Sequence, residues 1–466
     1  MMSTLLVKNT AVLVTMDDQR QEIQNGGLFI RDNVIEQIGP TDSLPETADT
    51  VLDLSDHIVL PGFVNTHHHM YQTLTRALAQ EMDLFSWLKT LYPIWANLSD
   101  EAIYISTKTA LIEMMLSGCT ATSDHLYVFP NDCTLDSQIR AATEMGVRFH
   151  AARGSMSLGE SDGGLPPDRV TEDEAFILKD SQRLIETYHN NDRHSMMRIV
   201  LAPCSPFSVT PDLMRQSADL ARAYPGVRLH THLAETIEEE AFCLEVFGHR
   251  PVPYIESLGW TGDDVWHAHC VHMSDEEIDV FGRTGTGVAH CPSSNMILAS
   301  GIAPVVSWRE AGVRVGLGLD GSASNDGNHM IGEARMAMLL QKVAPDRYLS
   351  EVPGGRGGFA GDAKALDARQ ALELATRGGA SVLGRDDIGH LAPGMSADFI
   401  AINLNQVAYA GAHDPVAAVL YCQPRTVDYS VINGKVVVEN GRLITVDPDQ
   451  IVRRHREIAI SMVRDE

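Results

Sequence analysis

The sequence predicts an α/β protein in which a (β/α)8 TIM barrel is joined to a small β-sandwich built from both termini. Two observations lead to this prediction. Strand-like apolar runs alternate with helix signals through the long middle of the chain, and short β-branched runs separated by polar turns occupy both ends. The strand-like runs of the middle number eight. Eight βα units imply a closed parallel barrel, whose chemistry sits at the carboxyl ends of its strands.

The two ends of the chain share the pattern of antiparallel strands. Near the carboxyl end, Asn433-Gly434 and Asn440-Gly441 separate the runs, and both dipeptides favour tight hairpin turns. We therefore expect the first part of the sandwich in residues 1–59 and the second part in residues 393–446. A C-terminal helix is expected in residues 447–466.

The middle of the chain, residues 60–392, carries the barrel pattern. Its strand-like runs are residues 60–69, 119–123, 147–152, 198–203, 227–232, 265–269, 286–290 and 313–320. Helix signals lie between them, such as the cap and proline at Thr210-Pro211 and the capping box at Ser274-Asp275-Glu276-Glu277. Residues 353–361 interrupt this rhythm, because they are glycine-rich and have no period. We expect a flexible surface loop there and assign it no role.

Composition and charge narrow the possible functions. Of the 466 residues, 44% are hydrophobic and 21% are charged, which is ordinary for a globular enzyme. The 36 basic and 62 acidic residues give a net charge of -26, which disfavours nucleic acid and anionic membranes as partners and suits a small neutral or cationic substrate. The 7 cysteines form no CxxC pair, and no apolar run reaches about 18 residues. We therefore predict a cytoplasmic protein without a disulfide framework.

Polar residues at the expected strand ends form a candidate metal site. Because side chains alternate along a strand, His67 and His69 face the same way at the end of the first run. His232, His269 and Asp320 end the fifth, sixth and eighth runs, so all five residues should converge at one mouth of the barrel. Neutral imidazoles with one carboxylate suit Zn²⁺, or less often Fe²⁺, and such an ion makes a bound water acidic enough to act as a nucleophile. Taken alone, the first histidine pair would more often pack or titrate.

Two ambiguities accompany this site. His230 shares a face with His232 by the same alternation, although His232 lies nearer the mouth. Glu235 follows three residues later, where its carboxyl group is placed to carry a proton from water to a leaving group. The competing interpretation of Glu235 is a helix-start acid, because residues 238–240 are glutamates as well.

Four motifs in order are Pro61-Gly62-Phe63-Val64-Asn65-Thr66-His67-His68-His69, His230-Thr231-His232-Leu233-Ala234-Glu235, His267-Ala268-His269-Cys270 and Gly318-Leu319-Asp320-Gly321. This set resembles the motifs of the amidohydrolase superfamily, specifically its mononuclear aminohydrolases that act on heterocyclic rings. The resemblance implies four metal ligands: His67, His69, His232 and Asp320. It makes Glu235 the proton shuttle and His269 the residue that orients the catalytic water and stabilises charge. Asp320 would also accept the proton of that water.

The resemblance further implies one metal ion per chain. Binuclear members carry a bridging carboxylated lysine at the end of the fourth strand, where this sequence has Pro203-Cys204. Within the superfamily, several local segments are most similar to the 8-oxoguanine deaminases: residues 69–72, 124–127, 202–206, 290–296 and 320–326. This similarity implies release of ammonia from an oxopurine-like ring, with 8-oxoguanine, which gives urate, as the expected substrate. It also implies a homo-oligomer.

Other interpretations stay open. Within the same chemistry, the substrate could be a hydroxylated s-triazine, or the activity that of a guanine-type or isoxanthopterin-type deaminase. A catalytically inactive barrel that serves as a scaffold is the alternative from another class, and its expected signature is a lost ligand, yet none of the four is missing. Residues 316–321 spell GxGxxG, but this motif is weak in isolation and places Asp320 where a pyrophosphate would lie.

Four residues are candidate substrate contacts. Gln72 carries both a donor and an acceptor, as the amide edge of an oxopurine demands, and Trp87 could form a wall against an aromatic ring. Arg153, at the end of the third run, could meet a ring carbonyl, and His125 stands at the mouth after the second run. Each has a structural alternative, which is core packing for Trp87, an ion pair for Arg153 and packing for His125.

Overall fold

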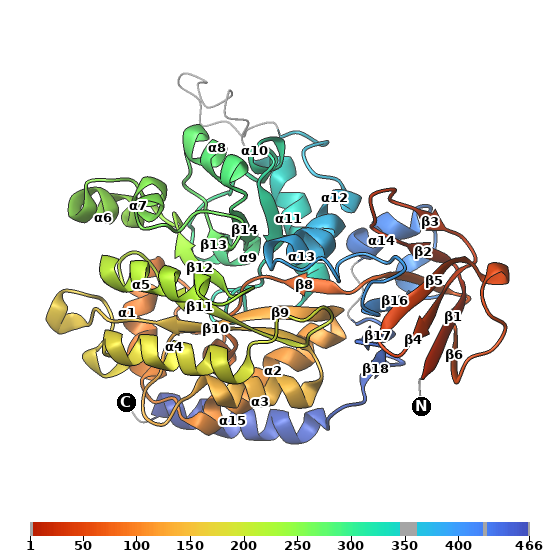
Figure 1. The fold of residues 1–466 in the computed structure, drawn as a ribbon, viewed down its shortest axis with the longest axis horizontal. Helices are drawn as coiled ribbons and strands as arrows, with labels where there is room; N and C mark the ends of the chain where they lie inside the picture. The colour runs from red at the N-terminus through yellow and green to blue at the C-terminus, as the bar shows by residue number, and fades with distance from the viewer. Residues whose placement is uncertain (1–2, 345–360, 423–425, 465–466) are drawn as a thin grey trace.

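The barrel predicted from the sequence is confirmed, because eight parallel strands close into one sheet in the order β10-β11-β12-β13-β14-β15-β8-β9. The computed structural model describes residues 3–344, 361–422 and 426–464. Figure 1 shows the barrel in the middle of the molecule and the small β domain at one side. The glycine-rich loop expected at residues 353–361 lies outside the described residues, except for Gly361.

Strands and helices alternate around the barrel. The strands are β8 (Phe63–Asn65), β9 (Cys119–Leu126), β10 (Arg148–Ser155), β11 (Met197–Pro203), β12 (Arg228–Leu233), β13 (Val265–His269), β14 (Gly287–His290) and β15 (Arg314–Leu317). The helices of this part are α1 (Leu84–Trp95), α2 (Asp100–Leu116), α3 (Leu135–Met145), α4 (Glu174–Tyr188), α5 (Pro211–Arg222), α6 (Ile237–Phe247), α7 (Pro251–Ser257), α8 (Asp275–Thr284), α9 (Pro292–Ile297), α10 (Val305–Glu310), α11 (Met330–Val343), α12 (Ala368–Glu373) and α13 (Gly379–Val382). Thr210 and Ser274 cap α5 and α8 as predicted, because their hydroxyl groups accept amide hydrogens that a helix start leaves unpaired.

The first predicted run, residues 60–69, is divided between two sheets and is not one strand. β7 (His57–Pro61) pairs with β16 (Phe399–Asn403) in the small domain, and only β8 continues into the barrel. Gly62 lies at the division and passes so close to Thr120 that a Cβ atom would lie 2.1 Å from its Oγ1. The three histidines therefore follow the end of a short strand.

The small domain consists of two sheets, with the orders β5-β4-β1-β6 and β19-β18-β17-β16-β7-β2-β3. Its remaining strands are β1 (Thr4–Thr10), β2 (Val12–Val14), β3 (Glu22–Ile23), β4 (Gly26–Arg31), β5 (Val34–Pro40), β6 (Thr50–Asp53), β17 (Tyr429–Ile432), β18 (Lys435–Glu439) and β19 (Arg442–Leu443). Leu5, Leu28 and Ile35 share one apolar cluster with Phe399 and Val431, so the two ends of the chain build the sandwich together. The residue limits given above for its two parts stay a prediction.

Packing closes the amino-terminal end of the barrel. Ala380, Val382 and Leu383 belong to the same apolar cluster as Val64 and Trp266 of the barrel strands. The interior is thus filled by side chains, as in other barrels of this kind, and the opposite end is the one that can carry a site.

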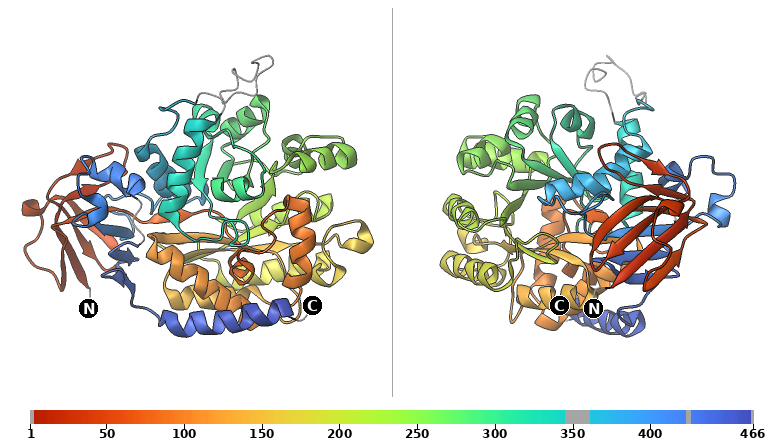
Figure 2. Two further views of the ribbon diagram at one scale, coloured as in Figure 1. Left: turned by 180° about the vertical axis from the view of Figure 1, so that it is seen from behind. Right: turned by 45° about the vertical axis from the view of Figure 1, so that its right-hand side comes forward.

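Two more helices complete the chain, α14 (Pro415–Tyr421) and α15 (Pro448–Arg464), and α15 runs along α2 on the outside of the barrel (Figure 2). His455 of α15 lies 3.0 Å from the hydroxyl group of Thr73, within the short helix η2 (Met70–Thr75) that follows the histidines. The C-terminal helix thereby supports the segment next to the candidate site. Among the described residues, no helix has the length and apolar character needed to cross a membrane.

Candidate active site

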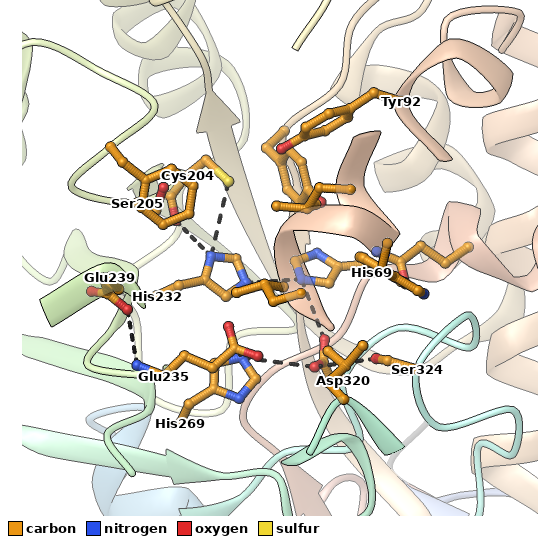
Figure 3. A pocket seen from close by; sticks show the side chains of 17 residues that line it. His69, Tyr92, Cys204, Ser205, His232, Glu235, Glu239, His269, Asp320 and Ser324 are labelled. Atoms are coloured by element: carbon orange, nitrogen blue, oxygen red, sulfur yellow. Dashed lines mark hydrogen bonds and ion pairs between the residues drawn. The ribbon is translucent and has the colours of Figure 1, made fainter. Parts of the chain in front are cut away.

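A cavity lies at the carboxyl ends of the barrel strands, and Figure 3 shows the side chains around it. It encloses about 480 Å³ of space between atoms, including its mouth. Its polar side is formed by His69, His232, Glu235, His269 and Asp320. Its apolar side is formed by Leu84, Trp87, Leu88, Tyr92, Phe207 and Leu298. Apolar walls with a few converging polar groups are typical of a site for a small molecule.

His67 lies beneath the cavity, and His230 orients its ring. His230 Nδ1 donates to the carbonyl oxygen of Trp266 (3.0 Å), so its Nε2 accepts a hydrogen bond from His67 Nδ1 (2.8 Å). This assignment leaves His67 Nε2 with a lone pair, and that buried atom has no hydrogen-bond partner among the described residues. Burial lowers the pKa of both rings and keeps them neutral. His67 thus offers an oriented nitrogen that suits a metal ion.

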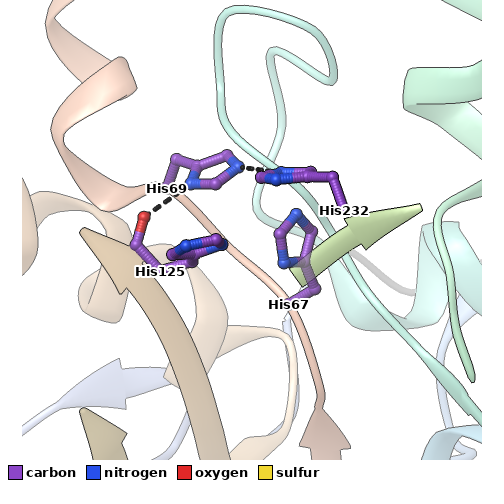
Figure 4. A group of neighbouring side chains, drawn as sticks. All are labelled: His67, His69, His125 and His232. Carbon is purple, nitrogen blue, oxygen red and sulfur yellow. Dashed lines mark hydrogen bonds between the residues drawn. The ribbon is translucent and has the colours of Figure 1, made fainter. Parts of the chain in front are cut away.

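His69 and His232 are held in the same tautomer by backbone carbonyl groups. His69 Nδ1 donates to the carbonyl oxygen of His125 (2.7 Å), and His232 Nδ1 donates to that of Cys204 (2.5 Å). Burial lowers the pKa of both imidazoles, that of His232 to about 3. Their Nε2 atoms therefore carry no hydrogen, although they lie only 3.0 Å apart (Figure 4).

Asp320 adds a carboxylate to the three imidazoles. Its Oδ1 lies 3.4 Å from the Nε2 atoms of both His67 and His69. Burial opposes its charge, but the close rings of His67, His69 and His269 hold the pKa of Asp320 well below its ordinary value. The residue has a φ of 62°, and the amide of Gly321 donates to its Oδ1 (2.7 Å). Three bare nitrogens and one carboxylate converge here, and this donor set fits Zn²⁺.

Glu235 and His269 lie beside these groups. Glu235 Oε2 is 3.6 Å from His269 Nε2, and the hydroxyl group of Ser300 lies 3.4 Å from Glu235 Oε1. Burial raises the pKa of Glu235 and favours its protonated form. Asn295 fixes the His269 ring by accepting a hydrogen bond from Nδ1 (2.9 Å). Burial alone would lower the pKa of His269, but the carboxyl groups of Glu235 and Asp320 raise it.

Two of the predicted substrate contacts, Gln72 and Trp87, line the cavity. The amide oxygen of Gln72 is buried and has no hydrogen-bond partner among the described residues, so it can accept a hydrogen bond from a ligand. Trp87 is also part of the core, and its indole Nε1 donates to the carbonyl oxygen of Ala323 (3.2 Å).

The other two, Arg153 and His125, are not among the residues around the cavity. Arg153 forms ion pairs with Glu172 (2.8 Å) and Asp180 (2.9 Å), which agrees with a structural role for its guanidinium group. His125 uses its Nε2 for a strand carbonyl oxygen at 2.6 Å, and its ring stacks on His232. His125 thus provides a backbone acceptor for His69, and its ring belongs to the same imidazole group as His67, His69 and His232, with a buried Nδ1 that has no hydrogen-bond partner among the described residues.

Sequence reasoning did not single out most of the apolar wall. Leu84, Leu88 and Tyr92 follow one another at intervals of four residues in α1, which places them on one face of that helix. Tyr127 comes directly after β9, where the same strand-end argument that found the histidines applies. Phe207, which follows β11 at a greater distance, had no comparable signal.

A closed parallel barrel that gathers three imidazoles, a carboxylate and a buried carboxyl group at one end defines a metal-dependent hydrolase. The chain belongs to the amidohydrolase family, which matches residues 58–437.

Several characterised proteins are similar to this chain over nearly its whole length. An 8-oxoguanine deaminase of Pseudomonas aeruginosa is 47% identical over 443 residues, which cover 94% of this chain and 95% of that protein. A hydroxydechloroatrazine ethylaminohydrolase of a Pseudomonas species is 36% identical, with 97% of this chain and 94% of that protein covered. Among solved structures, an atrazine chlorohydrolase of Arthrobacter aurescens complexed with zinc has a TM-score of 0.90 and 32% identity, with 98% of this chain and 100% of that chain covered.

Proposed function

We propose that this protein is a hydrolytic deaminase that converts 8-oxoguanine to urate with release of ammonia. The observation that carries this proposal is the convergence of three unprotonated imidazole nitrogens and Asp320 beside the buried carboxyl group of Glu235. Such a site is suited to hydrolysis. The choice of ring rests on the similarity to the 8-oxoguanine deaminase of Pseudomonas aeruginosa.

One Zn²⁺ ion per chain is the proposed cofactor, held by His67, His69, His232 and Asp320, with Fe²⁺ as the alternative. When bound, the ion would supply a Lewis acid that lowers the pKa of water. The end of β11 supports a single ion, because Pro203 and Cys204 stand there and neither can provide a bridging carboxylated lysine. The zinc in the structure of the related atrazine chlorohydrolase agrees with this choice.

The residues around the ligands would carry the protons of the reaction. Water adds its oxygen to the ring carbon that bears the amino group, the C–N bond breaks, and the amine leaves as ammonia after gaining a proton. Glu235 is proposed to deliver that proton, because burial favours its protonated form and it faces the space above the ligands. Asp320 is proposed to accept the proton of the attacking water, and His269 to orient that water and stabilise the developing negative charge.

The cavity suits a flat ring. Trp87, Tyr92 and Phe207 offer aromatic surface, and the amide of Gln72 can both donate and accept a hydrogen bond at the edge of an oxopurine. Hydroxylated s-triazines are the second candidate, supported by the 36% identity to the hydroxydechloroatrazine ethylaminohydrolase. Guanine and isoxanthopterin present similar amide edges and complete the set of substrates to be compared.

The test is release of ammonia from a panel of aminoheterocycles by metal-loaded protein. The panel contains 8-oxoguanine, guanine, isoxanthopterin and hydroxylated s-triazines, each with and without a chelator. We expect the highest kcat/KM with 8-oxoguanine, urate as product, and loss of activity in the chelated protein. Faster turnover of an s-triazine would show that the protein is a hydrolase of s-triazines. Absence of ammonia release from every compound of the panel would favour a catalytically inactive scaffold.

The proposal also includes the cellular compartment and the oligomeric state of the enzyme. All seven cysteines are free, which supports a reducing compartment such as the cytoplasm. Assembly as a homo-oligomer is proposed from the family resemblance alone, and light scattering after size-exclusion chromatography measures it directly.

A further inference from the structure

Glu239 makes an unusual pair of hydrogen bonds at the start of α6. Thr236 caps this helix, and the spacing from Thr236 to Glu239 is that of a capping box. In such a box the glutamate side chain bonds the backbone amide of the cap residue, as Glu277 does with Ser274 (2.7 Å) in α8. Glu239 instead reaches further upstream.

The two carboxylate oxygens of Glu239 bind the amides of the residues that precede the cap. Oε1 accepts from the amide of Ala234 (2.8 Å), and Oε2 accepts from the amide of Glu235 (2.9 Å). Figure 3 shows the second of these bonds, between the amide of Glu235 and the carboxylate of Glu239, which is also among the residues that line the cavity. One buried side chain thus holds both amides of the segment that presents the proposed proton carrier.

This segment needs support, because its backbone is strained. Ala234 has a φ of 50°, a left-handed conformation that costs free energy for a residue with a Cβ atom. Its carbonyl oxygen accepts from the amide of His272 (2.9 Å), so Ala234 is held from both sides. The strained turn points Glu235 toward His269 and Ser300, at 3.6 Å and 3.4 Å.

Burial of the Glu239 carboxylate costs free energy, and its place in a helix cap alone does not explain that cost. The residue is 1% exposed, and no ion pair joins it to a cation among the described residues. A buried carboxylate without a counter-ion loses the solvation it has in water, and hydrogen bonds must compensate for that loss. Burial accordingly raises the pKa of Glu239 to about 7. The hydrogen bonds from the amides of Ala234 and Glu235 compensate the Glu239 carboxylate for its lost solvation.

We propose that Glu239 is a positioning residue, whose carboxylate holds the amides of Ala234 and Glu235 and thereby fixes the Glu235 side chain in the geometry for proton transfer. This inference rests on the proposed role of Glu235. It concerns the backbone of the segment, so it can be tested both with and without turnover.

The first test measures, without any substrate, whether the two hydrogen bonds of Glu239 hold the amides of Ala234 and Glu235; we call this pair of bonds the clamp. Glu239→Gln keeps the shape of the side chain but replaces one acceptor by a donor, so one of the two amides loses its partner. Hydrogen exchange of the peptide that spans residues 233–237 should become faster in this variant. Glu238→Gln, an exposed neighbour on the same helix, is the matched control and should exchange like the wild type. Unchanged exchange in Glu239→Gln would overturn the clamp, whatever the enzyme's substrate.

The second test measures the consequence for catalysis. Glu239→Gln should retain the metal content and KM of the wild type and lose about 10- to 100-fold in kcat. Combined with Glu235→Gln, it should cause no further loss, because Glu239 acts through Glu235. An equal further loss in the double variant would show an independent structural effect and overturn the proposal. If hydrogen exchange becomes faster in Glu239→Gln but the wild type releases no ammonia from any ring, the two hydrogen bonds of Glu239 are confirmed and the proposed function is wrong.

Discussion

The Nε2 atoms of His69 and His232 lie 3.0 Å apart, and neither carries a hydrogen to donate to the other. Each ring donates its single N–H hydrogen from Nδ1 to a backbone carbonyl oxygen. Burial lowers the pKa of both rings and keeps them neutral. Two lone pairs that face each other repel, so this arrangement is unfavourable unless a positive charge lies near both. Together with the unpartnered Nε2 of His67, it gives three nitrogens whose lone pairs could bind a cation such as Zn²⁺.

The first prediction concerns metal content. His69→Ala removes one of three nitrogens, so the purified variant should retain less than about a tenth of the metal of the wild type, which should contain one equivalent per chain. Elemental analysis by mass spectrometry measures both. His413→Ala is the control, because that histidine is exposed and does not belong to the imidazole cluster. Two equivalents in the active wild type would contradict the single-ion site.

The second prediction concerns His230, which is not among the residues that line the candidate site's cavity. His230→Phe keeps an aromatic ring in place but removes the acceptor that orients His67 Nδ1 (2.8 Å). His67 can then change tautomer, so we expect the affinity for Zn²⁺ to fall by about 10- to 100-fold. Competition with a chromophoric chelator measures that affinity. His267→Phe is the control, because His267 bonds the carbonyl oxygen of Trp260 (3.0 Å) outside the cluster, and an equal loss in both variants would argue against the role of His230.

The third prediction separates proton transfer from metal binding. Glu235→Gln preserves the shape of the side chain but cannot exchange a proton, so kcat should fall by about 10²- to 10⁴-fold while the metal content stays at the wild-type level. Steady-state ammonia release and elemental analysis on the same preparation provide the measurement. Normal turnover by this variant would show that another group delivers the proton.

The sequence predicted the barrel because each barrel strand is a short apolar run that ends in polar residues. It did not predict that residues 60–69 serve two sheets, because β7 and β8 follow one another in one apolar run, whereas the amide of Gly62 donates to the carbonyl oxygen of Asp398 and that of Phe63 to the carbonyl oxygen of Gly118. The division depends on backbone partners that lie far away in the sequence, which no local pattern contains.

The candidate site was predictable to the extent that it consists of strand ends. His67, His69, His232, His269 and Asp320 come together because the carboxyl ends of parallel strands meet at one rim. Arg153 also ends a strand region, but Glu172 and Asp180 from the following segment bind its guanidinium group away from the cavity. The apolar wall comes from α1, an inserted helix whose docking over the mouth is a tertiary contact without a local signature.

The fourth prediction compares the two polar residues expected at the substrate. Gln72→Leu removes the amide that lines the cavity, so kcat/KM for the oxopurine should fall by about 10- to 100-fold, mainly through KM. Arg153→Lys should leave KM unchanged and lower the thermal midpoint, because it weakens buried bonds to Glu172 and Asp180. Steady-state kinetics and thermal unfolding of both variants decide the matter. A raised KM in Arg153→Lys would return that residue to the substrate contacts.

The fifth prediction concerns acid stability and a buried ion pair at the closed end of the barrel. Asp387 binds the Arg385 guanidinium group through both oxygens, each at 2.8 Å, and both side chains are 1% exposed. The amide of His194 donates to the same carboxylate (2.7 Å). Burial opposes the charge of Asp387, but Arg385 and this amide hold its pKa far below the ordinary value.

The sign of the pH effect follows from that depressed pKa. The stability contributed by Asp387 is complete above the pKa of the unfolded chain, about 3.9, and is lost as the pH falls below it. Asp387→Asn leaves Arg385 buried without its partner, so it should cost about 3 kcal/mol at pH 7, and the difference from the wild type should shrink between pH 4 and pH 3. Asp386→Asn is the control, because its pair with Arg193 is exposed and should contribute little at any pH. Urea unfolding of the metal-free proteins across this range measures the difference, and parallel curves for Asp387→Asn and wild type would mean that Asp387 is not the group that titrates.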